Sequence, residues 1–191
     1  MNFKLAILGK SLVGKSALIF RYINDKFPEL HDTTIEDQYN INTSINGIEC
    51  NVEILDTAGQ ESYQTMLDSW IHFANGYVLV YSINDKESFE VVKDRLNSIF
   101  KLKFQEDSST KPCIIVIGNK TDLDSDRIVE YDTAYDYCKE LDVDYIECSA
   151  LSKLNVKEAF SKLLERMINS KRKNTITSSK KEVKEKRCFC F

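Results

Sequence analysis

One segment constrains the fold of this chain more than any other, because Gly9-Lys10-Ser11-Leu12-Val13-Gly14-Lys15-Ser16 matches the pattern G-x-x-x-x-G-K-[ST]. It follows a predicted apolar strand over residues 3–8 and precedes a predicted helix over residues 15–25. Glycines let the backbone turn tightly so that N–H groups point at phosphate oxygens, and the helix adds its positive N-terminal end. The pattern predicts that Lys15 neutralises phosphates and that the Ser16 hydroxyl holds Mg²⁺. The alternative is an ordinary glycine turn, which the flanking strand and helix disfavour.

A second motif, Asp56-Thr57-Ala58-Gly59-Gln60-Glu61, follows the second strand of a predicted hairpin. A carboxylate at the end of an apolar strand beside the first loop is well placed to be the second magnesium partner, with Asp56 acting through a bound water. The N–H of Gly59 can bind a γ-phosphate, and Gln60 can orient an attacking water. Taken alone, an aspartate after a strand is usually a turn residue, so the interpretation depends on the first loop.

A third motif, Asn119-Lys120-Thr121-Asp122, identifies the base. The Asp122 carboxylate can accept hydrogen bonds from N1–H and the exocyclic amine of guanine, whereas adenine offers no such donor pair and would leave the carboxylate unpaired. Ser149-Ala150 closes the last predicted strand, and the Ala150 N–H can donate to the guanine O6. Each of these two motifs is also compatible with a simple polar turn.

The pattern of apolar residues predicts an α/β fold. Period-two runs on both sides of Asn46-Gly47 predict a β-hairpin with a type I′ turn. Further strands are predicted at residues 77–81, 113–117 and 145–148, and helices over segments that include residues 89–99, 132–141 and 156–167, the last with Asn155 as N-cap. This order predicts a six-stranded, mostly parallel sheet with one antiparallel strand and helices on both faces.

Composition indicates a soluble globular chain, because 42% of its 191 residues are hydrophobic and 29% are charged. No apolar run approaches the roughly 18 residues of a membrane helix, and no signal-peptide cleavage site follows the N-terminal segment. Residues 171–187 hold eight Lys/Arg and two Asp/Glu, a net of +6, while the remainder holds 18 basic and 28 acidic residues, a net of −10. The acidic body argues against nucleic-acid binding, and the basic segment suits an anionic membrane surface.

Four cysteines lie scattered in apolar segments, namely Cys50, Cys113, Cys138 and Cys148. Without a secretory signal they are predicted to be reduced core residues rather than disulfides or metal ligands.

The ordered set GKSLVGKS, TIEDQY, DTAGQE, NKTD and SA resembles a Ras-type small GTPase over residues 3 to about 170, and TIED resembles the Ras subfamily. The resemblance implies a P-loop NTPase G domain over residues 1–170, followed by a flexible basic tail over residues 171–191. It implies a GTP/GDP switch with slow, Mg²⁺-dependent GTP hydrolysis, in which Gln60, Lys15 and Thr34 are catalytic. The metal would be held by Ser16, Thr34 and Asp56. The expected nucleotide-binding residues are Gly9, Ser11, Leu12, Val13, Gly14, Lys15, Ser16, Ala17, Phe27, Thr34, Asp56, Gly59, Asn119, Lys120, Asp122, Ser149 and Ala150.

The same resemblance implies a nucleotide-sensitive surface. Its effector-binding residues would be Asp32, Thr33, Thr34, Ile35, Glu36, Asp37, Gln38 and Tyr39, with Tyr63 and Met66 in a second switch surface. The expected partners are effectors, a guanine-nucleotide exchange factor and a GTPase-activating protein, each bound by a monomer. A solvated loop and strand edge is the alternative for this segment.

Several residues depart from the family pattern. Ser11 and Leu12 replace two glycines of Ras loops, which places the response to an activating protein and the exchange rate in question. His31 and Thr33 stand where Ras has Tyr and Pro. The segment around the effector-binding residues 32–39, the first switch of the family, is therefore expected to be more flexible. Leu151 replaces a Lys, and its apolar side chain can still cover the base.

The terminal sequence Cys188-Phe189-Cys190-Phe191 has the outline of a C-a-a-X box, although Phe189 and Cys190 are not aliphatic. A terminal Phe favours geranylgeranylation of Cys188 over farnesylation. One prenyl chain and the basic run before it suffice for reversible anchoring at the cytoplasmic face of a membrane, expected to be the plasma membrane. An unmodified thiol on a charged tail is the alternative.

Two other functions compete with the switch. One is a binding module that stays loaded with GTP, which Ser11 and Leu12 alone favour. The other is a P-loop kinase or ATPase, which would need a lid or second-substrate domain and which NKTD disfavours.

Overall fold

The computed structural model describes residues 1–28, 36–57, 66–107 and 111–188, with the backbone alone for Glu36 and for residues 174–188. In chain order its elements are β1 (Asn2–Leu8), α1 (Lys15–Asn24), β2 (Glu36–Ile45), β3 (Ile48–Thr57), α2 (Leu67–Phe73), β4 (Gly76–Ser82), α3 (Lys86–Glu106), β5 (Cys113–Asn119), the 3₁₀ helix η2 (Thr121–Asp126), α4 (Tyr131–Glu140), β6 (Asp144–Glu147) and α5 (Val156–Cys188).

The sheet has six strands in the order β2-β3-β1-β4-β5-β6. β2 and β3 pair antiparallel, and every other pair is parallel. Asn46 and Gly47 both have positive φ, at 51° and 75°, as the two central residues of a type I′ turn require. The predicted fold class and hairpin are therefore confirmed.

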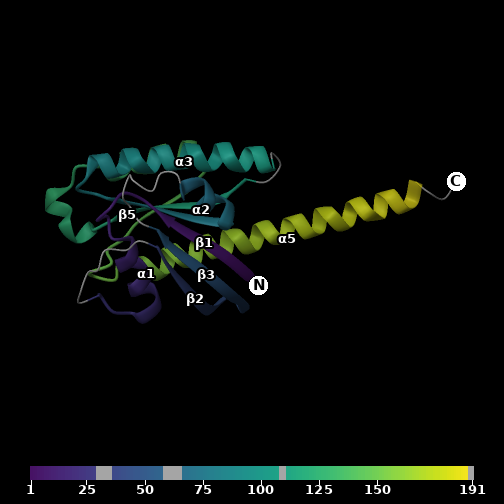
Figure 1. Cartoon of the computed structure of the whole chain (residues 1–191), viewed down its shortest axis with the longest axis horizontal. Helices are drawn as coiled ribbons and strands as arrows, with labels where there is room; N and C mark the ends of the chain where they lie inside the picture. Colours follow the sequence, from purple (N-terminus) through teal and green to yellow (C-terminus); the bar gives the residue numbers. More distant parts are fainter. Residues whose placement is uncertain (29–35, 58–65, 108–110, 189–191) are drawn as a thin grey trace.

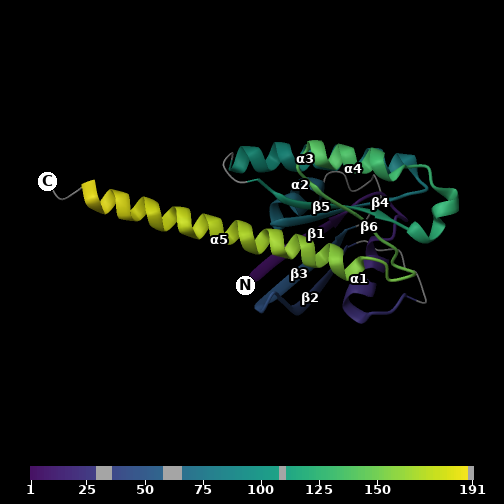
Figure 2. The same ribbon diagram turned by 180° about the vertical axis from the view of Figure 1, so that it is seen from behind.

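Helices cover both faces of the sheet, with α1 and α5 on one side and α2, α3 and α4 on the other (Figures 1 and 2). Alternation along β1 explains this, because Leu5 and Ile7 pack in the core under α1 and α5 whereas Ala6 and Leu8 pack in the core under α2, α3 and α4. Since the central parallel strands are covered on both faces, β4 and β5 are buried along their whole length. The polar motifs therefore lie where the strands end.

The boundaries of the predicted elements differ in a few places. β2 begins at Glu36, three residues before the predicted alternation, because it pairs with β3 up to Thr57. α2 was not predicted, because its seven residues are too few to show a helical period. Asn155, the predicted N-cap of α5, has φ 57° and donates its side-chain N–H to the Glu147 carbonyl.

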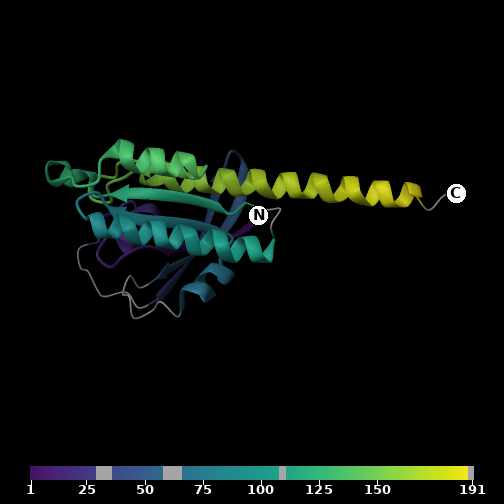
Figure 3. The same ribbon diagram turned by 90° about the horizontal axis from the view of Figure 1, so that it is seen from above.

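The last helix continues as backbone helix to Cys188, where the sequence predicts a flexible tail from residue 171. Figure 3 shows this part of α5 projecting away from the sheet. Lys, Glu and Arg have high helix propensity, and neither Gly nor Pro follows Gly118 to end a helix. The flexibility of the tail stays a prediction. Within the residues described, no helix combines the length and apolarity of a membrane span.

The four internal cysteines are free and buried, as predicted. Burial raises the pKa of the Cys138 and Cys148 thiols to about 12, so both are held as neutral thiols.

Candidate nucleotide-binding site

The loop between β1 and α1 has a backbone that glycine alone can adopt at two points. Gly9 has φ 153°, and a Cβ there would lie 2.2 Å from the Val80 carbonyl oxygen. Gly14 has φ 95°, and its Cβ would lie 2.4 Å from Nδ2 of Asn119. Leu12 has φ 64° and a side chain that is 75% exposed, so its bulk points to solvent. The predicted requirement for glycine is therefore confirmed, since a side chain would clash with Val80 of β4 at Gly9 and with Asn119 of β5 at Gly14.

Lys15 begins α1 and is 6% exposed. Its Nζ donates to the carbonyl oxygens of Gly9 at 3.1 Å and Lys10 at 3.0 Å, so the ammonium lies inside the curve of the loop. Burial lowers the pKa of Lys15 to about 8, while the charge of nearby Asp56 acts in the opposite direction. A buried cation facing carbonyl groups is suited to receive the negative charge of phosphates.

Asp56 lies near the end of β3 beside Ile7 of β1 and is fully buried. The neighbouring Thr57 hydroxyl donates to the Ile7 carbonyl at 2.7 Å, which fixes the end of this strand against the loop. Ser16 lies in the first turn of α1, next to Lys15. One carboxylate and one hydroxyl next to a phosphate site fit Mg²⁺, which is usually bound by few protein oxygens together with phosphates and water. Within the described residues no cluster of three His, Cys, Asp or Glu side chains forms a metal site.

Asn119, the first residue of the NKTD motif, joins this motif to the Gly9–Ser16 loop and to Ser149-Ala150. Its Nδ2 donates to the Val13 carbonyl at 2.8 Å, and its Oδ1 accepts from the Ala150 N–H at 3.3 Å. Lys120 follows with φ 67°, which turns the chain from β5 into η2. The Ser149 hydroxyl donates to Oδ1 of Asp122 at 2.5 Å, so the loop after β6 also orients the proposed base-reading carboxylate.

A partly buried polar network beside η2 and β6 supports this segment, and it was not predicted from the sequence. Arg127 donates to both carboxylate oxygens of Glu147, at 2.7 and 2.9 Å. Tyr145 donates to Glu147 at 3.0 Å, and its hydroxyl is bonded to that of Tyr81. These bonds tie β6 to the chain after η2. A hollow of about 570 Å³ lies here, lined in part by Asp122, Arg127 and Glu147.

Arg21 was also missed by the sequence analysis. It is 7% exposed in the last turn of α1, and its guanidinium donates to the carbonyl oxygens of Asp25, Ala150 and Leu151. The ring of Phe27, which is 43% exposed, lies 6.0 Å from the guanidinium carbon. An arginine among the apolar positions of a buried helix is the signal that would have found it.

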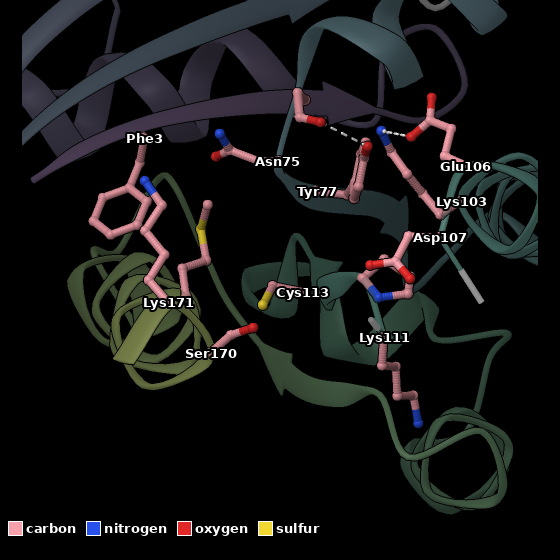
Figure 4. Close-up of a pocket in the computed structure, with 13 residues that line it drawn as sticks. Phe3, Asn75, Tyr77, Lys103, Glu106, Asp107, Lys111, Cys113, Ser170 and Lys171 are labelled. Atoms are coloured by element: carbon pink, nitrogen blue, oxygen red, sulfur yellow. Dashed lines mark hydrogen bonds and ion pairs between the residues drawn. The ribbon is translucent and has the colours of Figure 1, made fainter. Parts of the chain in front are cut away.

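A cavity of about 260 Å³ opens at the end of the sheet opposite the motifs, where β1, β4 and β5 begin (Figure 4). Phe3, Tyr77, Cys113 and Met167 line its apolar part, and Lys103, Glu106 and Lys171 lie at its rim. Burial raises the pKa of the Cys113 thiol, so this cysteine is not an activated nucleophile. The cavity holds none of the motif residues.

Some predicted site residues lie outside the described residues. These are Asp32, Thr33, Thr34, Ile35, Gly59, Gln60 and Tyr63. Of the expected effector segment, Asp37 and Gln38 are exposed and Tyr39 is partly buried on β2, the edge strand of the sheet. The side chain of Cys188 is likewise outside the described part.

Comparison with known proteins decides the family. The Ras family model matches residues 4–169. This chain belongs to the Ras family. Its relatives include the Ras-like protein RAS2 of Hydra vulgaris, 35% identical over 98% of this chain and 95% of the relative. Ral-B of Mus musculus is 36% identical over 97% and 92%, and R-Ras of Homo sapiens is 38% identical over 84% and 72% of the respective chains.

Ras-family proteins are GTP-binding switches that hydrolyse GTP, and this chain is therefore a GTPase. The match with R-Ras spans 161 residues, and it agrees with the Ras-type resemblance predicted from the sequence. The departures at Ser11, Leu12 and Leu151 thus lie within a Ras-family fold, and each is at least partly exposed in the loops expected to bind the nucleotide.

Proposed function

We propose that this Ras-family GTPase is a signalling switch that binds effectors through residues 32–39 while it carries GTP and hydrolyses GTP slowly. The proposal rests on the two hydrogen bonds of the Asn119 side chain, one donated to the Val13 carbonyl and one accepted from the Ala150 N–H. Together they hold the phosphate loop and both proposed base-reading loops at the end of the sheet where the parallel strands finish. Exposed β2 residues at the sheet edge support an effector surface, because an edge strand offers unpaired backbone groups to a partner.

Ser16, Thr34 and Asp56 would hold Mg²⁺, which supplies charge neutralisation at the phosphates when it is bound. Lys15 binds the same phosphates with its buried ammonium, and Gln60 orients the attacking water. Residues 25–39 and 56–66 contain no arginine. Slow intrinsic hydrolysis follows, because the positive charge that stabilises the transition state would have to come from an activating protein.

Replacing Gln60 with Leu is expected to slow single-turnover hydrolysis by about tenfold or more, because the leucine cannot hold a water in position. Equilibrium binding of GDP should stay within about twofold of the wild type, since Gln60 is not proposed to contact the base or the β-phosphate. The assay uses radiolabelled GTP preloaded on the full chain, with and without an activating protein. Equal rates in both proteins would remove Gln60 from the mechanism.

The same assay separates the switch from a module that stays loaded with GTP. A wild-type chain that releases no phosphate, even with an activating protein, would favour the module. The departures at Ser11 and Leu12 would then account for the loss.

We also propose that Cys188 is prenylated and that the basic residues of 171–187 support attachment of a monomer to the cytoplasmic face of the plasma membrane. The net charge of +6 suits an anionic surface, and one prenyl chain alone binds only weakly. Mass spectrometry of the C-terminal peptide from the native host is expected to show an isoprenoid on Cys188. Cys188→Ser should release the protein from the membrane fraction, and an unmodified peptide would contradict the anchor.

A further inference from the structure

Arg21 is a buried cation that donates three hydrogen bonds to backbone carbonyl groups. Nε donates to Ala150 at 2.7 Å, one terminal nitrogen donates to Leu151 at 2.9 Å, and the other donates to Asp25 at 2.9 Å. The Asp25 carboxylate itself is paired with Lys153 at 2.7 Å. The planar guanidinium thus uses three donor directions to join two segments that are more than a hundred residues apart in the sequence.

The bonds from Arg21 fix the loop that follows β6. Since a peptide group is planar, holding the carbonyls of Ala150 and Leu151 fixes two consecutive peptide planes. The loop has no glycine, and Lys153 and Asn155 have φ values of 70° and 57°, so its conformation is strained and needs support from outside. Arg21 supplies that support at Ala150, whose N–H donates a long hydrogen bond to Asn119 Oδ1 at 3.3 Å and is proposed to share this donor with the guanine O6.

The second contact of Arg21 is with Phe27, which the family resemblance also places among the nucleotide-binding residues, packed edgewise against the base. Its guanidinium carbon lies 6.0 Å from the centre of the Phe27 ring, within the range of a cation–π interaction. The Asp25 carbonyl that it also holds lies two residues before Phe27. One side chain therefore connects the residues expected on two sides of the guanine.

We propose that Arg21 is a positioning residue of the guanine subsite, which holds the Ala150–Leu151 loop and Phe27 around the base and thereby sets the rate of nucleotide release. The proposal rests on the proposed function, in which Ala150 reads the guanine O6. The described contacts of Arg21 are with the carbonyls of Asp25, Ala150 and Leu151 and with Phe27, and none of these residues belongs to the Gly9–Ser16 loop, so we expect it to act on dissociation and not on the hydrolytic step.

The test measures dissociation of fluorescent GDP and 6-thio-GDP from the full chain in the wild type, R21A and R21K. R21A and R21K are expected to release GDP about tenfold faster or more, because hydrogen bonds that order the loop are lost. Lysine keeps the positive charge and the aliphatic stem of the side chain but lacks the planar guanidinium. R21K therefore tests the loss of the three hydrogen bonds even if R21A does not fold. Hydrolysis of preloaded GTP should stay within about twofold in a single turnover.

Arg166→Ala is the matched control. Arg166 of α5 donates to the Asp142 carbonyl and the Asp144 carboxylate, both at 2.9 Å, far from the motif residues in the sheet. R166A removes comparable bonds and should lower stability while it leaves GDP release within about twofold of the wild type. Equal acceleration of release in R166A and R21A would assign a merely structural role to Arg21 and overturn the inference.

The sulfur analogue supplies a readout specific to the base. Sulfur is a weak acceptor, so the wild type is expected to release 6-thio-GDP faster than GDP, and this ratio should shrink towards one in R21A and R21K. A ratio that persists unchanged in both variants would overturn the role of Arg21 alone. A wild type that tightly binds both nucleotides and releases them at the same rate would overturn the proposed Ala150 contact, and the inference with it.

Discussion

Replacing Lys15 with Met is expected to stabilise the nucleotide-free domain by about 1–3 kcal/mol and to weaken GDP binding about 100-fold. The stabilisation follows from the burial that lowers the pKa of Lys15 from 10.5 to about 8, which corresponds to a cost on the order of 3 kcal/mol for holding the charge. Loss of the hydrogen bonds to the Gly9 and Lys10 carbonyls offsets part of that gain. Binding weakens because methionine cannot neutralise phosphate.

The pH dependence of stability tests the cause. Between pH 8 and 10.5 the unfolded chain binds more protons at Lys15 than the folded chain does, so the free energy of unfolding of the wild type rises with pH through this residue. Below pH 8 the residue is protonated in both states, and the full cost is present. The rise is expected to approach about 1 kcal/mol per pH unit, and Lys15→Met should lack it.

Urea denaturation of the nucleotide-free proteins between pH 7 and 9.5 measures both effects. Buried cysteines such as Cys148, whose pKa is raised, oppose the rise above pH 9 in both proteins, so the difference between the two isolates Lys15. Lys101→Met, on the exposed side of α3, controls for the loss of a surface charge. A variant that is less stable than the wild type at pH 7 would contradict the assigned cost.

Residues that are required by a local backbone conformation were predictable from the sequence, because the conformation depends on only a few neighbouring positions. Gly9 and Gly14 were expected from the loop pattern, and each occupies a place where a side chain would meet another strand or motif. The type I′ turn at Asn46-Gly47 is a two-residue signal of the same kind. Period-two and helical spacing gave the sheet and the longer helices, since these elements repeat often enough to show a pattern.

Residues that act across the fold were not predictable in this way. Arg21 and Ala150 are separated by 129 positions, and their contact exists only because α1 and the loop after β6 lie on the same side of the sheet. The bond between Arg127 and Glu147 likewise depends on where β6 lies beside β5. In each case the sequence supplies the residue type, but the partner is fixed by tertiary structure.

Both missed contacts act on the loops proposed to read the base. The phosphate loop is ordered by its own glycines and by Lys15, whereas the base-reading loops contain no glycine after Gly118 and depend on side chains from elsewhere. We therefore expect affinity for the phosphates and specificity for the base to depend on largely different residues, although Asn119 is bonded to both sets of loops. Variants at Lys15 and at Asp122 should accordingly fail in different ways.

Replacing Asp122 with Asn is expected to weaken GDP binding about 100-fold or more and to strengthen binding of xanthosine diphosphate by a comparable factor. The carboxylate is proposed to accept from N1–H and the exocyclic amine of guanine. Xanthine keeps N1–H but carries a carbonyl oxygen in place of that amine, so an amide donor matches it and a carboxylate does not. The structure favours one orientation of the new amide, because the Ser149 hydroxyl donates to Oδ1 at 2.5 Å and an amide oxygen at this place would keep that bond.

Competition binding with GDP and xanthosine diphosphate measures the change, and Ser149→Ala in the Asp122→Asn background supplies the control. Without the hydroxyl the amide can turn either way, so the preference for xanthine should diminish in the double variant. Hydrolysis at saturating xanthosine triphosphate should match that of the wild type with GTP, since Asp122 contacts no phosphate. Loss of GDP binding with no gain for xanthine would show that Asp122 supports the loop without reading the base, and the guanine assignment would then need another residue.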